Sequence, residues 1–185
     1  MALSTEQGFP YWLAVGTIWR GWALAVQGQA EEGIAQIRQG LTAFRATGSE
    51  FLRPYFLTLL AEAYAQRGQA EEGLAVVSEA LETVATTGER FYEAELHRLQ
   101  GELSLQVPTP PAEAEACLQQ ALAVARRQQA KSLELRAAMS LARLWQRQGK
   151  RDAARALLAP IYGWFTEGFD TADLQEARGL LDALG

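Results

Sequence analysis

The chain has 185 residues, a formal net charge of −5 and hydrophobic residues at 49% of its positions, the composition of a folded protein. The acidic balance argues against general nucleic-acid binding, because a phosphate-binding surface needs a net basic charge. The single cysteine, Cys117, excludes an internal disulfide and fits a reducing compartment. The N-terminus lacks a secretory signal, and no apolar run approaches the ~20 residues that span a bilayer. We therefore expect a cytoplasmic protein that has no membrane partner.

A hexapeptide occurs twice in the sequence, 40 positions apart. Gly-Gln-Ala-Glu-Glu-Gly occupies residues 28–33 and again residues 68–73. Aligning 21–50 with 61–90 without gaps gives 12 identities in 30 positions. Repetition at a fixed interval indicates a repeat architecture. Because each copy lies between two segments with helical spacing of apolar residues, it predicts the turn of a helical hairpin.

Four pairs of helices follow one another along the chain. Their predicted bounds are 9–27 and 30–47, 51–67 and 70–87, 91–106 and 112–129, and 132–148 and 151–165. We expect Thr109 and Ser132 to cap the helices that follow them, and Pro110 to occupy a first helical position. Pro160 should kink or shorten its helix by removing one backbone hydrogen bond. Thr171 should cap one last helix, 172–184, which would cover the end of the array.

The predicted fold is all-α, with about four helical hairpins followed by a capping helix. The hairpins cover residues 8–48, 51–88, 91–129 and 132–168, the capping helix covers 172–184, and together they form one domain spanning 1–185. A closed bundle is the alternative arrangement for the same helices. The even period of 40 to 41 residues argues against the bundle.

Small residues recur at equivalent positions of the four repeats. The first helices carry Gly21, Ala61, Gly101 and Ala142, and the second helices carry Gly33, Gly73, Ala114 and Ala154. Large apolar residues follow at Ile37, Val77, Leu118 and Leu158. Helices that cross at close range need small side chains at the contact. This pattern resembles the tetratricopeptide repeat (TPR), and the resemblance implies a right-handed superhelix, or solenoid.

The period is longer than the ordinary TPR period of about 34 residues. Residues 91–103 are also similar to a recurrent phrase in a long-period variant of the repeat. That variant forms the C-terminal repeats of bacterial signalling ATPases of the maltose-regulon-activator type and occurs in ATPase–adenylate/guanylate cyclase fusions. The resemblance implies that this chain is a sensor or scaffold part of a larger signalling protein.

The sequence offers little catalytic chemistry. It lacks the glycine patterns of dinucleotide and phosphate loops. Cys117 and His97 lie on successive helices and could meet, but a nucleophile pair also needs an orienting third group. Glu93 with His97 would leave a zinc site two ligands short. We therefore expect that the chain is not an enzyme and that it binds no metal and no cofactor. The weakest hypothesis is an unfamiliar catalytic site around Glu95, His97, Arg98 and Glu102.

The TPR resemblance implies a binding site on the concave face, which the first helix of each repeat lines. The expected partner-binding residues are Trp22, Tyr55, Thr58, Glu62, Gln66, Glu95, Arg98, Glu102, Arg136, Arg143 and Arg147, with Ile18 and Met139 beside them. The partner would be a peptide or a domain, with its acidic end over the last three arginines. The carboxylate clamp of co-chaperone repeats is not implied, because the chain has no asparagine.

Charge is distributed unevenly along the chain. Residues 126–155 carry 9 basic and 2 acidic side chains, whereas residues 1–125 carry 7 basic and 15 acidic ones. The basic segment is either an ordinary solvated helical surface or a patch for an acidic peptide or domain face.

The first helix is apolar on all sides, and such a helix expects cover on both faces. Either upstream repeats precede it, or two copies of the chain associate through residues 9–26, with Trp12 and Trp19 in the contact. The sequence thus predicts a non-catalytic protein-interaction or regulatory module. The alternative is a small-molecule effector-sensing domain of a signalling ATPase.

Overall fold

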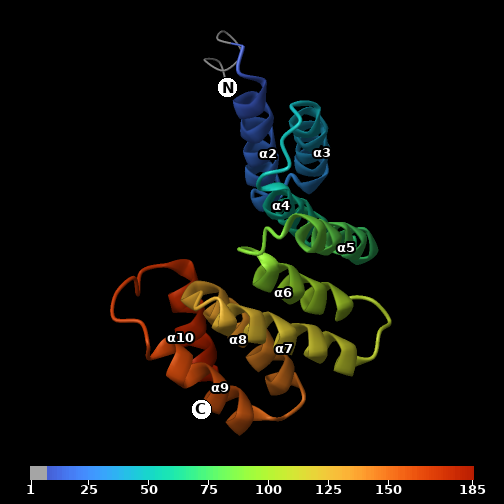
Figure 1. Cartoon of the computed structure of the whole chain (residues 1–185). Helices are drawn as coiled ribbons and strands as arrows, with labels where there is room; N and C mark the ends of the chain where they lie inside the picture. The colour runs from blue at the N-terminus through green and yellow to red at the C-terminus, as the bar shows by residue number, and fades with distance from the viewer. Residues whose placement is uncertain (1–7) are drawn as a thin grey trace. The chain divides into compact units, whose positions relative to one another are not determined.

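The computed structural model describes residues 8–185, which form nine α-helices joined by turns and contain no strand (Figure 1). The helices are α2 (Pro10–Val26), α3 (Ala30–Ala46), α4 (Arg53–Gln66), α5 (Ala70–Thr87), α6 (Glu93–Ser104), α7 (Pro111–Arg127), α8 (Lys131–Arg147), α9 (Arg151–Tyr162) and α10 (Ala172–Leu184). The predicted all-α class is confirmed for these residues. None of these helices is long and apolar enough to cross a membrane. The chain divides after Tyr92 into two compact units, here called the N-terminal and C-terminal halves.

In the N-terminal half, α2 and α3 form the first hairpin, and both pack on α4, which pairs with α5. The two helices of the first hairpin meet backbone to backbone. A Cβ atom added at Gly21 would lie 2.7 Å from the carbonyl oxygen of Gly33, and one added at Gly33 would lie 2.6 Å from that of Gly21. No side chain fits such a gap, so the small residues at these positions are a steric requirement.

The C-terminal half repeats the same order of contacts. Helix α6 packs on α7 and α8, α7 packs on α8, and α8 packs on α9. Its core contains the small and large positions of the repeat together, with Leu118, Ala142, Ala154 and Leu158 fully buried. The equivalence of positions deduced from the sequence therefore corresponds to equivalent packing.

Helix α10 lies where the first helix of a fifth hairpin would lie. It contacts α9 and α8, as α4 contacts α3 and α2. Leu174, Leu180 and Leu184 are buried against these helices, whereas Glu176 and Asp182 are exposed. An apolar inner face with a polar outer face is what the closing element of a repeat array needs.

The ends of the second helices show how the turn is made. Gly48 and Gly88 have φ values of +76° and +75°, in the left-handed region that glycine adopts at low cost. In the third repeat the equivalent residue is Gln129, and it holds the same conformation with φ +56°. The turn geometry is therefore kept where the glycine is missing.

Several predicted helix starts were wrong. Thr109 does not cap α7; its hydroxyl donates to the carbonyl of Ser104 at 2.5 Å, and Pro110 is the N-cap residue. Ser132 lies inside the first turn of α8, whose N-cap is Ala130. Helix α4 begins two residues late because Leu52 has φ +66°.

The predictions for α9 and α10 agree better with the observed helix ends. Pro160 shortens α9, which ends at Tyr162 rather than near residue 165. Thr171 is the N-cap residue of α10 as expected, but its hydroxyl donates to the carbonyl of Gly168 at 2.7 Å instead of accepting from the helix.

The backbone contact in the first hairpin leads to a stability prediction. Gly33→Ala should destabilise the protein by about 1–3 kcal/mol, because the added methyl forces α2 and α3 apart. Gly179→Ala in α10 is the matched control, since nothing lies within 4 Å of the added methyl. There, the better helix propensity of alanine should stabilise by about 0.5–1 kcal/mol. Urea denaturation of both variants measures the difference, and effects of the same sign would contradict this account.

Candidate functional site

Five aromatic side chains form a connected group in the N-terminal half, here called the aromatic row. Its members are Trp19, Trp22, Tyr55, Phe91 and Tyr92. The Trp19 ring centroid lies 6.0 Å from that of Trp22 and 5.8 Å from that of Tyr55. Tyr55 in turn lies 4.9 Å from Tyr92 and 6.3 Å from Phe91. Trp19 and Phe91 remain 43% and 48% exposed, so the row presents apolar surface to solvent.

A carboxylate lies beside this row. The indole N–H of Trp22 donates to Glu62 Oε2 at 2.9 Å, which joins α2 to α4. Tyr55 and Glu62 are seven residues apart on α4 and therefore share a face. Burial, and then the negative charge of Glu62, raise the pKa of the Tyr55 phenol, so it stays a neutral hydrogen-bonding group at neutral pH. The structure thus brings together three of the residues predicted for the partner site.

Two other residues expected near this surface are buried, and a third, Gln66, is exposed. Thr58 is fully buried, and its hydroxyl donates to the carbonyl of Pro54 at 3.0 Å. Ile18 is also fully buried, against the position of Gly40. Placing these two in the partner site was wrong, because Ile18 packs against α3 and the hydroxyl of Thr58 is bonded within α4. Gln66 is exposed at the last position of α4.

The residues predicted from the third and fourth repeats form an internal ion cluster in the C-terminal half. Glu95 Oε1 accepts from Arg98 Nη2 at 2.6 Å and pairs with Arg136 Nη2 at 2.9 Å. Arg98 Nη1 also pairs with Glu102 Oε2 at 2.6 Å, and the Ser140 hydroxyl donates to Glu102 Oε1 at 2.6 Å. Two carboxylates and two guanidinium groups balance one another and join α6 to α8.

Burial decides the role of this cluster. Glu95 is 1% exposed and Arg98 is 7% exposed, so neither presents a surface to a partner. Met139, expected beside the site, is buried as well. Their assignment to an open face was wrong, since opposite charges on adjacent first helices pair with each other instead. Separating such buried ions is costly, so the cluster holds helices in place.

The pKa of Glu102 follows from these contacts. Burial disfavours its charged form, but the Arg98 guanidinium, the Ser140 hydroxyl and the Arg143 charge outweigh burial and hold the pKa below its ordinary value. Glu102 is therefore a carboxylate at neutral pH. It cannot act as a proton donor there.

The basic side chains of segment 126–155 are largely matched by acceptors within the C-terminal half. Arg143 pairs with Glu176 at 2.5 Å, and Lys150 with Glu115 at 3.9 Å. Arg126 and Lys131 both bind Glu134, at 2.9 and 2.7 Å. Arg127 lies 3.7 Å from Glu93, while Arg151 and Arg155 donate to backbone carbonyls of α10. Arg147 is exposed, and its Nε lies 3.4 Å from the carbonyl of Arg143.

The surface of α2 carries the predicted self-association residues. Trp12 is 61% exposed and Trp19 is 43% exposed. Phe9 and Val26, near the two ends of the helix, are also exposed. The helix therefore has apolar surface that the described residues leave uncovered.

The only histidine and the only cysteine do not have the properties of a catalytic pair. Burial lowers the pKa of His97, against the influence of Gln100 and Glu93, while burial raises the pKa of the Cys117 thiol. Both groups are therefore neutral at neutral pH, whereas a reactive cysteine needs its thiolate form. In the part of the chain that the structure describes, no three His, Cys, Asp or Glu side chains gather as metal ligands would.

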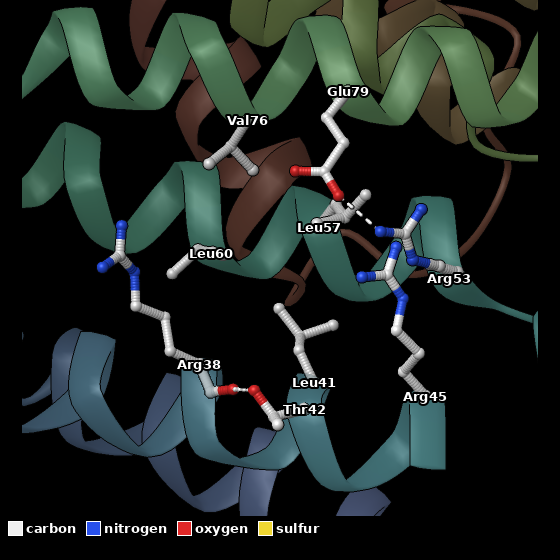
Figure 2. A pocket seen from close by; sticks show the side chains of 9 residues that line it. All are labelled: Arg38, Leu41, Thr42, Arg45, Arg53, Leu57, Leu60, Val76 and Glu79. Carbon is white, nitrogen blue, oxygen red and sulfur yellow. Dashed lines mark hydrogen bonds and ion pairs between the residues drawn. The ribbon is translucent and has the colours of Figure 1, made fainter. Parts of the chain in front are cut away.

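A recess of about 350 Å³ lies between α3, α4 and α5 (Figure 2). Its lining residues are Arg38, Leu41, Thr42, Arg45, Arg53, Leu57, Leu60, Val76 and Glu79. No motif in the sequence marks this site. Its residues on α3 lie at positions 38, 41, 42 and 45, and this helical spacing is the one indication of the site in the sequence. The walls from α4 and α5 could not be predicted, because they depend on how the helices pack.

A second recess, of about 470 Å³, lies in the C-terminal half around the start of α10. Leu135, Phe165 and Leu174 line its apolar part, and Glu167 and Asp173 its acidic part. The two recesses thus differ in the sign of their charge.

Solved structures of other proteins share this architecture. No protein-family model and no curated protein matches the chain. Solved structures do match, among them two with TM-scores of 0.67 and 0.69. Both are of a protein from Podosopora anserina, provisionally assigned as a kinesin light chain, with nearly identical TPR-like repeats. The chain has a TPR-like repeat fold. One structure is 20% identical to this chain, with a TM-score of 0.67, and covers 95% of this chain and 86% of its own. The other, of a single-substitution variant, is 19% identical, with a TM-score of 0.69 and coverage of 95% and 85%.

The ion cluster leads to a pH-dependent prediction. The folded-state pKa of Glu102 lies below the ordinary glutamate value of about 4.3. Its stabilising contribution is therefore complete above that value and is lost as the pH falls through the folded pKa. Glu102→Gln should lower the free energy of unfolding at neutral pH, and its difference from the unmodified chain should shrink below about pH 4.3.

Urea denaturation at a series of pH values measures this difference. Glu167→Gln is the control, because Glu167 is exposed on the loop before α10 and should change stability little at any pH. A difference for Glu102→Gln that stays constant down to strongly acidic pH would show that the cluster does not depend on the ionised form.

Proposed function

We propose that this chain is a non-catalytic interaction scaffold that binds a peptide or a protein domain. The aromatic row carries this proposal, because Trp19 and Phe91 stay exposed beside the carboxylate of Glu62. Exposed aromatic residues with a polar neighbour are typical of protein interfaces. The TPR-like fold supports the proposal, since consecutive first helices offer an extended surface to a partner.

The partner that we propose carries both apolar and acidic residues. Its apolar residues would pack on the aromatic row. Its acidic residues would pair with Arg136, Arg143 and Arg147 of α8. Of these three, Arg147 is the most exposed. Arg136 and Arg143 already pair with carboxylates of this chain, so each would bind a partner carboxylate in addition to its own. Such shared pairs contribute more to specificity than to affinity.

The parent protein that we propose is a cytoplasmic bacterial signalling protein. The 40-residue period and the similarity of residues 91–103 to the long-period repeats of signalling ATPases support this. In such a protein the repeats would act as a regulatory part. A nucleotide-binding domain encoded upstream in the same reading frame would be the supporting observation.

A small-molecule effector-sensing role is the second candidate. The recess between α3, α4 and α5 favours it, because a volume of about 350 Å³ lies at the lower end of the range for small-ligand sites.

The scaffold proposal is tested by selecting short peptides on the purified chain from a display library. We expect the selected peptides to combine apolar and acidic residues. Phe91→Ser should weaken their binding about tenfold, the effect of removing one aromatic anchor. Phe169→Ser is the matched control, because Phe169 is 47% exposed and Phe91 48%. Arg143→Glu combined with Arg147→Glu should weaken binding further for peptides that carry acidic residues.

Two results would reject the proposed site. One is that no peptide sequence is enriched. The other is that the enriched peptides bind the Phe91→Ser and the double-arginine variants as tightly as the unmodified chain.

We also propose that two copies of the chain associate through α2. Trp12 supports this, because a tryptophan that is 61% exposed on an otherwise apolar helix is a strong candidate for an interface anchor. Light scattering from micromolar to millimolar concentration should show a shift from monomer to dimer. Trp12→Ser should abolish this shift, whereas Trp164→Ser, at a tryptophan that is 58% exposed in the C-terminal half, should leave it unchanged. A monomer at every concentration would disprove this association.

A further inference from the structure

The recess between α3, α4 and α5 combines an apolar floor with a positively charged rim. Leu57, Leu60 and Val76 are buried and form the floor, and Leu41 from α3 lies beside them. Three arginines and one glutamate line the rim, which gives it a net charge of +2. The chain as a whole carries −5, so this is a local reversal of its charge.

Arg53 is the fixed part of this rim. Its Nη1 donates to Thr83 Oγ1 at 3.0 Å, its Nη2 pairs with Glu79, and its Nε lies 3.6 Å from Glu50. These contacts use most of its donors and neutralise its charge. Arg53 therefore acts as a wall of the recess, with Glu79 held against it (Figure 2).

Arg38 and Arg45 supply the uncompensated charge. Within residues 8–185 neither forms an ion pair, and both are exposed. The Arg38 guanidinium lies over the ring of Tyr64, 5.6 Å from its centroid, which orients it while its N–H groups remain able to donate. In Figure 2, Arg45 lies with Arg53 at one end of the recess, and Arg38 lies at the other.

The helical spacing explains this arrangement. Arg38 and Arg45 are seven residues apart, so they share one face of α3 and are separated by about 10 Å along its axis. Leu41 lies between them on that face. An elongated apolar group could cover Leu41 and the floor while an anionic end reaches an arginine.

We propose that this recess binds a small amphipathic carboxylate. The carboxylate pairs with Arg45, and the apolar chain lies over Leu41, Leu57 and Leu60 toward Arg38. Guanidinium groups bind carboxylates through two parallel hydrogen bonds. A ligand with an ammonium group in place of the carboxylate cannot form them, because it has no acceptor and carries the same charge as the arginines. The site lies on the side of the second helices α3 and α5, whereas the aromatic row involves α2, α4 and the turn before α6.

Octanoate is the probe for this site, titrated into the full chain and followed by isothermal calorimetry and by amide NMR shifts. A ligand of this size should bind with a Kd on the order of 1 mM. The NMR shifts should map to α3, α4 and α5. Acetate, which lacks the apolar chain, and octylammonium, which has the opposite charge, should bind at least about tenfold more weakly.

The arginines are tested by Arg45→Gln and Arg38→Gln. Arg45→Gln should weaken octanoate binding about tenfold, the loss of one charge-assisted pair, and the double variant should abolish it. Arg20→Gln, an exposed arginine on α2 outside the recess, removes the same charge and should leave binding unchanged. Phe91→Ser should also leave it unchanged, which separates this site from the proposed peptide surface.

Four results would overturn the proposal. One is that octanoate shows no saturable binding, and another is that the double arginine variant binds it as well as the unmodified chain. Octylammonium could bind equally well, which would indicate apolar contact alone. Finally, the shifts could map to the acidic recess at the start of α10, which would exclude the arginine-lined recess as the site.

Discussion

The close contact between the two helices of each hairpin is the constraint on which the rest of the structure depends. In the first hairpin, Gly21 and Gly33 leave no room for a side chain. The same pair of positions holds alanine and glycine in the second repeat, glycine and alanine in the third, and two alanines in the fourth. A Cβ added at Gly101 in the third hairpin would lie 2.7 Å from Leu118 Cγ. The hairpins therefore share one crossing point, and the size of the residues there sets how closely the helices approach.

That crossing fixes which residues of consecutive first helices face one another. Trp22 and Glu62 occupy equivalent positions 40 residues apart, and a hydrogen bond joins them. Glu95 and Arg136 occupy another pair of equivalent positions, 41 residues apart, and form an ion pair. The repeat period thus places like positions side by side, and complementary side chains at these positions then bind each other.

This lateral pairing explains how far the sequence could predict the candidate site. The spacing placed Tyr55 with Glu62, and Glu95 with Glu102, on common faces, and this is correct for α4 and α6. It could not show that Glu95 and Arg98 are buried, because their burial depends on Arg136 and Ser140 arriving from α8. Helix bounds followed the same rule. Helices α5 and α10 match their predicted bounds, whereas Thr109 failed as a cap because the carbonyl of Ser104 competes for its hydroxyl.

The distribution of charge along the sequence differs from its distribution in the folded chain. The basic segment 126–155 stands out in the sequence, yet the C-terminal half that contains it carries 11 basic and 12 acidic side chains and is nearly neutral. Several of its basic side chains meet carboxylates from outside the segment, as Arg143 meets Glu176 and Lys150 meets Glu115. The N-terminal half carries 6 basic and 10 acidic side chains. Arg38 and Arg45 do not stand out in that acidic sequence. In the fold they lie beside an apolar floor, and the one carboxylate of the recess, Glu79, pairs with Arg53 instead. An excess of charge along a sequence therefore does not by itself show which charges the folded chain leaves unmatched.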